Sequence, residues 1–232
     1  MQDRHIIEAA GMTRIVIENG KVVETGNPKI SFCPFAKRFA SPINPVTPDA
    51  VSKNIEHRIA SFGMCTRDRV VLDDESQVLF GASELLTTAL KNKTVDAAVI
   101  CCDGAGTVVV TSPRLIQGIG GRMSGLVETV PYPEVISRIE EAGGIVIDKK
   151  TASLDALRGI AEAKKRGFAT VAVTVAGFQY ELAEEIRAAY PDAVIIGVHT
   201  TGVQSIEDAK RLCAASDLVF ACASKHIRDA AK

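Results

Sequence analysis

The 232-residue sequence predicts an α/β fold: a mainly parallel sheet flanked by helices, with an N-terminal segment that contains a β-hairpin. Two observations carry this prediction. From about Val95 onward, short apolar runs alternate with amphipathic stretches, which is the pattern of parallel strands joined by helices. Before that point, Asn19-Gly20 separates two β-branched runs, which is typical of a tight hairpin turn.

We therefore expect two parts that pack together as one compact unit. Residues 1–94 would form the hairpin and a helical segment, and residues 95–232 would form the α/β main domain. No stretch of flexible composition separates the two parts, so the sequence indicates packing of one on the other rather than a linker between them.

In the N-terminal part, the expected hairpin strands are residues 14–17 and 21–24, and a proline-rich loop follows them. Thr47-Pro48-Asp49 then favours the start of a helix, because it offers an N-cap, a proline at the first helical position and an acid in the first turn. Gly63 is placed to end that helix. A shorter helix is expected over residues 83–91.

In the main domain, strand-like apolar runs begin near residues 95, 145, 170, 193 and 217. Helices are expected between them over residues 133–142, 153–166, 180–189 and 205–215. Because βαβ crossovers put helices above and below a parallel sheet, both faces of the sheet should be covered.

The composition argues against two classes of function, nucleic-acid binding and membrane binding. The 27 Lys and Arg balance 28 Asp and Glu, which gives a formal net charge of −1 and no field that attracts nucleic acid or membranes nonspecifically. The absence of Trp and the 5% aromatic content also disfavour a base-stacking surface. Neither a signal-peptide pattern nor a membrane-length apolar run occurs, so we expect a cytoplasmic protein without nucleic-acid or membrane partners.

Polar and reactive residues collect where the predicted strands end. Ligands bind at the carboxyl ends of parallel strands, so these residues should meet at one edge of the sheet. An imidazole at such an edge serves as a general base, a metal ligand or a capping hydrogen bonder, and a thiol beside a lysine and a helix N-terminus is either activated or simply buried. The candidate catalytic residues are His199, Cys222 and Asp103.

Two glycine-rich stretches lie between Cys101 and Gly125. They suggest backbone N–H groups that cradle a phosphate or carboxylate, although neither has the Walker or the dinucleotide-binding pattern, and tight turns without a ligand are the alternative. The candidate ligand-binding residues from these stretches and from the strand ends are Gly104, Gly106, Thr107, Gly118, Gly120, Gly121, Arg122, Thr200, Thr201, Ser224 and Lys225.

The cysteines contain no CxxC pair, so no standard zinc or iron–sulfur spacing exists. A metal or iron–sulfur site assembled from distant positions would use Cys33, Cys65 and Cys102.

Several of these stretches together resemble the methanogenesis marker protein 8 family. They are residues 62–66, 104–108, 117–126, 198–202 and 221–225, and the similarity spans nearly the whole chain. The resemblance implies an archaeal cytoplasm and a task linked to methane formation, but no established catalytic residues.

The sequence leaves three functions open. The first is an enzyme of cofactor metabolism that binds a small anionic molecule at the strand ends. The second is a noncatalytic accessory protein that carries a metal, cluster or cofactor to a methanogenic enzyme. The third is an assembly factor whose glycine loops dock on such an enzyme.

Overall fold

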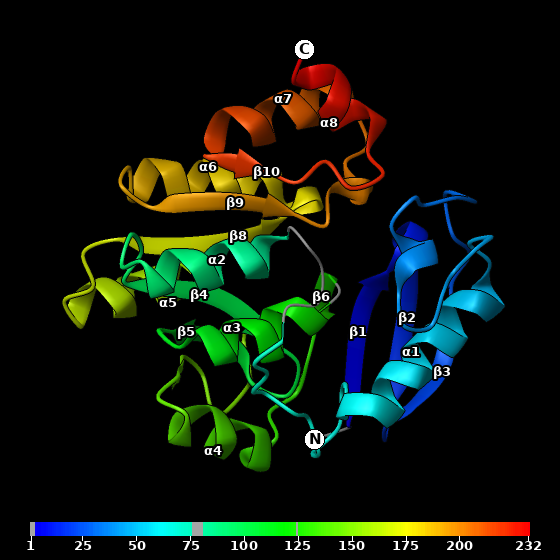
Figure 1. Ribbon diagram of the computed structural model, residues 1–232, viewed down its shortest axis with the longest axis horizontal. Coiled ribbons are helices and arrows are strands. Elements are labelled where there is room, and N and C mark those ends of the chain that lie inside the picture. The colour runs from blue at the N-terminus through cyan, green and yellow to red at the C-terminus, as the bar shows by residue number, and fades with distance from the viewer. Residues whose placement is uncertain (1–2, 76–80, 124) are drawn as a thin grey trace.

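The computed structural model describes residues 3–75, 81–123 and 125–232, and it places their strands in two sheets (Figure 1). Sheet A is antiparallel, in the order β3 (Lys21–Thr25), β2 (Thr13–Glu18), β1 (Arg4–Ala9), β6 (Gly125–Glu128). Sheet B has the order β10 (Leu218–Val219), β9 (Val194–Val198), β8 (Val171–Ala176), β4 (Ala97–Cys102), β5 (Gly106–Val110), β7 (Ile145–Val146).

The helices divide between the two sheets. The α-helices are α1 (Pro48–Phe62), α2 (Ala82–Lys91), α3 (Pro113–Ile119), α4 (Pro133–Glu141), α5 (Ala156–Lys165), α6 (Tyr180–Ala189), α7 (Ile206–Ala215) and α8 (Lys225–Ala230). Short 3-10 turns are η1 (Ala10–Met12), η2 (Ala36–Arg38), η3 (Gly120–Arg122), η4 (Gly177–Gln179) and η5 (Thr200–Gly202). None of the helices in the described part of the chain is long and apolar enough to span a bilayer.

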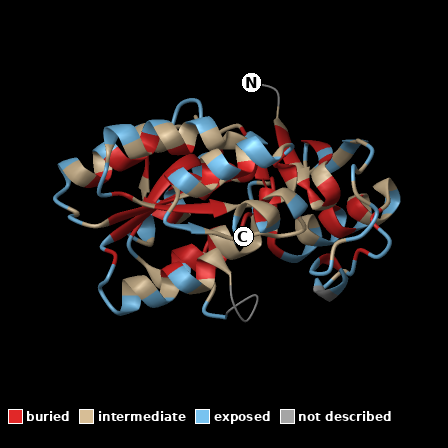
Figure 2. Ribbon diagram, turned by 90° about the horizontal axis from the view of Figure 1, so that it is seen from above, coloured by how far each residue is buried: buried red, intermediate tan, exposed pale blue. Residues whose placement is uncertain are grey.

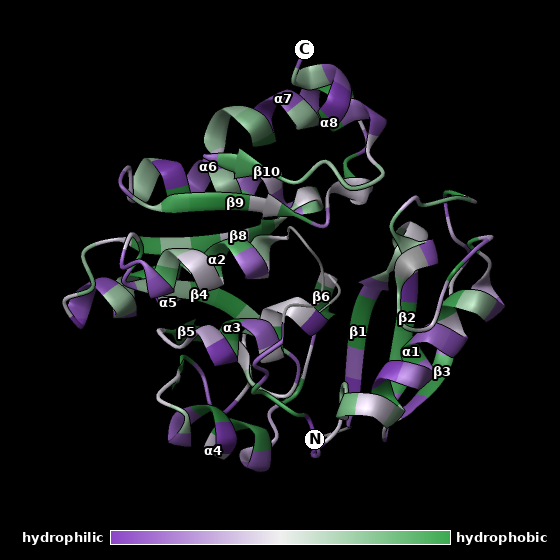
Figure 3. Ribbon diagram, in the orientation of Figure 1, coloured by the Kyte–Doolittle hydropathy of each residue, from purple (hydrophilic) through white to green (hydrophobic). Residues whose placement is uncertain are grey.

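Sheet B is covered on both faces, as the sequence predicts. Alternate residues of β4 show why: Ala98 and Ile100 face the core beneath α2, α3 and α4, whereas Ala97 and Val99 face the core beneath α5, α6 and α7. Buried and apolar residues accordingly follow the strands, and exposed polar residues follow the outer sides of the helices (Figures 2 and 3).

The local signals of the N-terminal part are also confirmed. Asn19 and Gly20 both have positive φ, +50° and +70°, which is the turn conformation that joins β2 to β3. Thr47 caps α1 by accepting a hydrogen bond from the Ala50 N–H at 3.2 Å, and Gly63 ends the helix at φ +71°. The apolar face of α1 packs on sheet A.

The prediction of a mainly parallel sheet is only partly right. Strands β4, β8, β9 and β10 are parallel, but β5 and β7 pair antiparallel, and all of sheet A is antiparallel. The difference arises at Gly104-Ala105-Gly106, which turns the chain back on itself, so that β5 lies beside β4 instead of leading into a helix.

The two predicted parts share secondary structure. Strand β6, from the second part, pairs with β1 of the first, with Leu126 opposite Ile7. Helix α2, also from the first part, packs against α3 on sheet B. The division near residue 94 stays a prediction about folding units, and β6 is the strand that ties them together.

Candidate active site

The carboxyl ends of β8 and β9 run into two 3-10 turns, η4 and η5, that contact each other. Turn η5 also contacts η1, the turn that joins β1 to β2 in sheet A. The ends of β4, β9 and β10 therefore lie at the side of sheet B that faces sheet A (Figure 1). We call this side the junction edge.

At the junction edge, His199 and Glu8 form a pair that joins the two sheets. The His199 Nε2 atom lies 3.0 Å from Oε1 of Glu8, which belongs to β1. Both side chains are about three-quarters buried, with 23% and 20% of their surface exposed. A carboxylate only accepts hydrogen bonds, so this contact places the imidazole proton on Nε2 and leaves the lone pair on Nδ1.

The backbone around this pair leaves no room for further side chains. A Cβ on Gly125 would lie 2.8 Å from Cδ2 of His199, and one on Gly202 would lie 3.0 Å from Oε1 of Glu8. His199 itself takes the left-handed conformation, at φ +51°. Strained non-glycine residues persist where the surroundings determine them fully, and they cluster at functional sites. The pair is therefore held in one defined geometry.

Thr200 and Thr201 connect the end of β9 to the end of β10. The buried Thr200 hydroxyl donates to the carbonyl of Phe220 at 2.6 Å, and the Thr201 hydroxyl accepts a bond from the Ala223 N–H at 3.4 Å. These contacts bring His199 and Cys222 to neighbouring positions of the same edge. Ligand binding by the two threonines stays a prediction.

Cys222, Ser224 and Lys225 follow β10. Cys222 is half-buried and, like His199, left-handed, at φ +47°. Its carbonyl accepts a hydrogen bond from Arg228, which steadies the turn. Ser224 is buried and caps α8 through the N–H of Ile227, whereas Lys225 is exposed. The catalytic role of Cys222 and the ligand roles of Ser224 and Lys225 stay predictions.

Asp103 is fully buried in an ion pair with Arg69. Arg69 Nε lies 2.9 Å from Asp103 Oδ1, and the N–H of Cys65 donates to Oδ2 at 2.5 Å. Burial would raise the pKa of Asp103, but the Arg69 guanidinium and these hydrogen bonds hold it below its usual value. Both carboxylate oxygens thus already have partners, and the predicted catalytic role of Asp103 stays a prediction.

The first glycine-rich stretch is a tight turn between two strands. Gly104 and Gly106 have φ of +83° and +74°, and a Cβ on Gly106 would lie 2.3 Å from the backbone of Ala152. Thr107 is buried, and its hydroxyl accepts a hydrogen bond from the Asp155 N–H at 2.7 Å. Packing accounts for all three residues, and anion binding by them stays a prediction.

The second stretch is helical rather than an open loop. Gly118 lies in α3, where a Cβ would come within 2.2 Å of the Val71 carbonyl oxygen, and Gly120 and Gly121 lie in η3. Arg122 pairs with Asp73 and stacks over the Phe62 ring at 5.1 Å. Their anion-binding roles also stay predictions. Ser124, within the same stretch, lies outside the described residues.

The three cysteines proposed as metal ligands lie in different settings. Cys33 lies partly exposed in the proline-rich loop, whereas Cys65 and Cys102 are completely buried. Burial, with the nearby Asp103 carboxylate, raises the pKa of both buried thiols and so disfavours the thiolate that a metal needs. In the ranges that the structure describes, no three His, Cys, Asp or Glu residues group as metal ligands.

Sequence reasoning missed Glu8 and Arg69. Glu8 interrupts the apolar run Ile6-Ile7-Glu8-Ala9, and a lone acid in such a run is a signal of a specific partner. Arg69 lies in an extended segment without a local pattern, so nothing in the sequence separates it from the neighbouring exposed Arg67.

The fold and the junction edge define a two-sheet α/β protein with an imidazole–carboxylate pair between its sheets. The chain belongs to the archaeal family described as "Uncharacterized protein conserved in archaea (DUF2099)", whose profile matches residues 5–232. It is 44% identical over 234 residues to "Uncharacterized protein MJ0054" of Methanocaldococcus jannaschii, across 99% of this chain and 81% of the relative. No solved structure matches the chain.

Proposed function

We propose that this chain is a cytoplasmic enzyme of cofactor metabolism in methanogenic archaea, acting on a small molecule that carries a phosphate or carboxylate. The reaction would take place at the junction edge. The archaeal family and the resemblance of residues 198–202 and 221–225 to the methanogenesis marker protein 8 family support the cellular setting.

The observation that carries the proposal is the 3.0 Å contact between His199 Nε2 and Glu8 Oε1. A carboxylate that holds an imidazole by one nitrogen fixes its tautomer and orientation, and it stabilises the imidazolium that forms when the other nitrogen takes a proton. Within the described residues, Nδ1 of His199 has no hydrogen-bond partner. Nδ1 is therefore the atom that would accept the proton of a substrate and return it later in the cycle.

Cys222 would supply a nucleophile or substrate ligand, and Lys225 would supply a positive charge that binds the anionic part of the substrate. Cys222 lies three residues after the neighbouring strand β10 and offers a thiol near the same edge, as a nucleophile or a ligand to the substrate. Lys225 is exposed at the start of α8 and offers an ammonium group to the anionic part of the substrate. The geometry thus supports proton transfer on an anionic substrate, with covalent catalysis as the additional role of Cys222.

The proposal is tested by ligand-induced thermal stabilisation against a panel of phosphorylated and carboxylated metabolites. At least one compound should raise the melting temperature, because a ligand that binds only the folded state stabilises it by an amount that grows with the logarithm of the ligand concentration relative to Kd. Lys225→Ala should lower the affinity for that compound at least 10-fold, and Lys165→Ala, which removes another exposed lysine, on α5, should leave it unchanged.

Turnover of that compound then tests the acid–base role. His199→Gln should reduce kcat by about 10²–10⁴ while the ligand still stabilises the variant. The matched control is His57→Gln, which changes an exposed histidine on α1. The proposal fails if no compound in the panel stabilises the wild type, or if His199→Gln turns over the substrate as fast as the control.

A further inference from the structure

The proline-rich segment from Gly26 to Pro48 forms a loop that is tied firmly to sheet A. The N–H of Lys29 donates to the carbonyl of Gly11 at 2.8 Å, and that of Val46 donates to the carbonyl of Ser31 at 2.8 Å. The Asn54 side chain of α1 holds the Ser41 carbonyl at 2.7 Å. We call this segment the aromatic loop.

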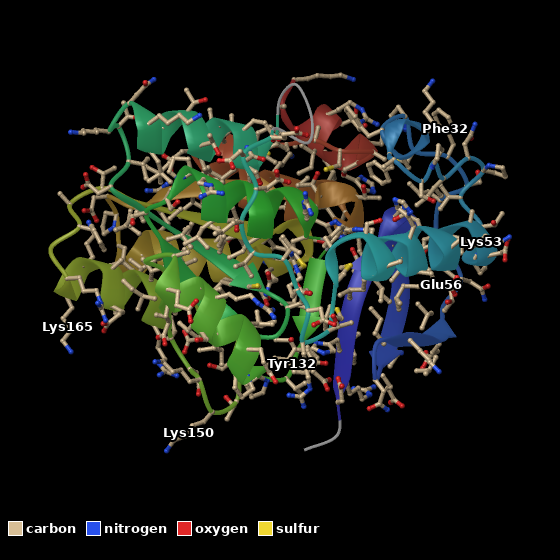
Figure 4. The ribbon with its side chains drawn as sticks, turned by 60° about the horizontal axis from the view of Figure 1, so that its bottom comes forward. Phe32, Lys53, Glu56, Tyr132, Lys150 and Lys165 are labelled. Atoms are coloured by element: carbon tan, nitrogen blue, oxygen red, sulfur yellow. The ribbon has the colours of Figure 1, made fainter. Side chains whose placement is uncertain are left out.

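The aromatic loop buries three aliphatic residues and exposes its three phenylalanines. Ala36, Ile43 and Val46 are buried in the core of sheet A, with 4% or less of their surface exposed. Phe32, Phe35 and Phe39 instead expose 52%, 43% and 39%. Figure 4 shows Phe32 at the periphery of the molecule, on this loop. Folding of a single chain favours the opposite choice, so the three rings indicate a surface that binds a partner.

The charge of the aromatic loop indicates what that partner offers. Between Gly26 and Pro48 the sequence has three basic residues and no acidic residue, in a chain with an overall charge of −1. Lys29 and Lys37 are exposed, and neither forms an ion pair within the part of the chain that the structure describes. A complementary surface would therefore carry carboxylates around apolar pockets.

We propose that the aromatic loop docks on an acidic partner protein, with Phe32, Phe35 and Phe39 in apolar pockets that carboxylates surround. Three basic residues are fewer than the clusters of four to eight that anionic membranes attract. Single-stranded nucleic acid needs a basic groove along its backbone, which three positions on one loop do not form. Rigid aromatic anchors with few charges are instead typical of the centre of a protein–protein interface.

The loop also lies beside the junction edge. Lys29 is bonded to Gly11 of η1, and η1 contacts η5, the turn that follows His199. A protein bound to the aromatic loop would therefore sit next to that edge. The docking surface does not depend on the proposed enzyme activity, and it can be tested without a substrate.

The test begins with photo-crosslinking in an extract of the organism that produces the chain. A benzophenone amino acid replaces Phe35 in one sample and, as a matched control, Leu85 of α2 in the other, since the two side chains are 43% and 44% exposed. A protein crosslinked only from position 35 is identified, purified and titrated against variants. We expect Phe35→Ala and Lys37→Glu to weaken its binding at least 10-fold, and Leu85→Ala and Lys165→Glu less than 2-fold.

The crosslinked peptide of the partner should contain acidic and apolar residues, and the affinity should fall as salt rises. The proposal is overturned if position 35 yields no specific crosslink, if the crosslinks join two copies of this chain, or if the variants bind the partner as the wild type does. It is also overturned if phosphatidylglycerol vesicles or oligouridine RNA bind in a way that Phe35→Ala abolishes. Unchanged melting temperatures of the variants exclude a folding defect.

Discussion

Arg69 and Asp103 form an ion pair in which both side chains are completely buried. The guanidinium also donates to the carbonyls of Gly118 and Ile119, and the carboxylate accepts the Cys65 N–H. The pair thus joins the end of β4, the end of α3 and the segment after α1. Burial alone would lower the pKa of Arg69. The Asp103 carboxylate acts against burial, and the pKa of Arg69 is raised above its ordinary value.

Removing one member of this pair should be strongly destabilising. Asp103→Asn leaves the Arg69 charge buried without its counter-charge, and such changes cost about 3–5 kcal/mol. Urea unfolding followed by circular dichroism measures the loss. The exposed pair of Arg67 and Glu134 is the control, and Glu134→Gln should shift the midpoint little, because water screens that pair. Equal shifts in the two variants would contradict this account.

The stability of the fold should depend on pH through His5. Its ring is buried between the hydroxyls of Thr129 and Tyr132, each at 2.8 Å, and Tyr132 in turn bonds to Asp3. Burial lowers the pKa of His5 below 6.5, although Asp103, Asp3 and Glu128 act to raise it. The unfolded chain therefore binds more protons below pH 6.5, so the free energy of unfolding should fall as the pH drops from 6.5 towards the folded-state pKa.

His5→Gln removes that titration. Urea unfolding at several pH values between 5 and 7 should show a shallower dependence in the variant than in the wild type, whatever the variant's absolute stability. Parallel curves for the two proteins would show that His5 does not titrate in this way.

A side chain at Gly106 should destabilise the fold by a steric clash with neighbouring backbone, and Gly143, which has no such neighbour, is the matched control. Gly106 and Gly143 both have positive φ, +74° and +84°, but only at Gly106 would a Cβ collide with neighbouring backbone. Gly143→Ala should cost about 1–2 kcal/mol of backbone strain. Gly106→Ala should cost about 1–3 kcal/mol more, from the overlap with Ala152. Chemical denaturation of both variants measures the loss in the free energy of unfolding. Equal losses in Gly106→Ala and Gly143→Ala would rule out the clash with Ala152.

The buried thiols should be protected in the folded state. Cys65 and Cys102 have no exposed surface, and burial raises the pKa of Cys101 to about 11. Iodoacetamide at pH 8 should therefore modify Cys65 and Cys102 only after unfolding. Cys101 is partly exposed, as Cys33 and Cys222 are, and it should react in the folded protein more slowly than they do because its thiol has a raised pKa. Mass spectrometry of peptides at successive times gives the rates. Rapid alkylation of Cys102 in the native protein would contradict the burial.

Sequence patterns predict the parts of this fold that local contacts determine. The Asn19-Gly20 turn and the caps of α1 depend on residues a few positions apart, so their signals are visible in the sequence. The pairing of β1 with β6 depends on residues 119 positions apart, Ile7 and Leu126, and no local pattern indicates it. At Gly104–Gly106 the sequence leaves a ligand loop and a tight turn both open, because glycine density fits either, and no pattern predicts that the turn pairs β5 antiparallel with β4.

The candidate site shows the same division. The strand-end rule places His199 and Cys222 after neighbouring strands, β9 and β10, at one edge, because parallel strands share a direction. It places Asp103 at the end of β4 as well, but the burial of that carboxylate depends on Arg69, from a segment without regular structure. The partner of His199 comes from the other sheet, which the strand-end rule does not address.

The position of Glu8 has a consequence for the newly made chain on the ribosome. Its partner, His199, is synthesised 191 residues later, and the neighbouring strand β6 also follows far behind β1. Contacts between such distant residues form late and slow the folding of a chain. The first strand must therefore wait with one edge unpaired until β6, which ends at residue 128 of 232, has been made. The proposed acid–base pair is then among the last contacts to form, so that activity would begin only when folding is complete.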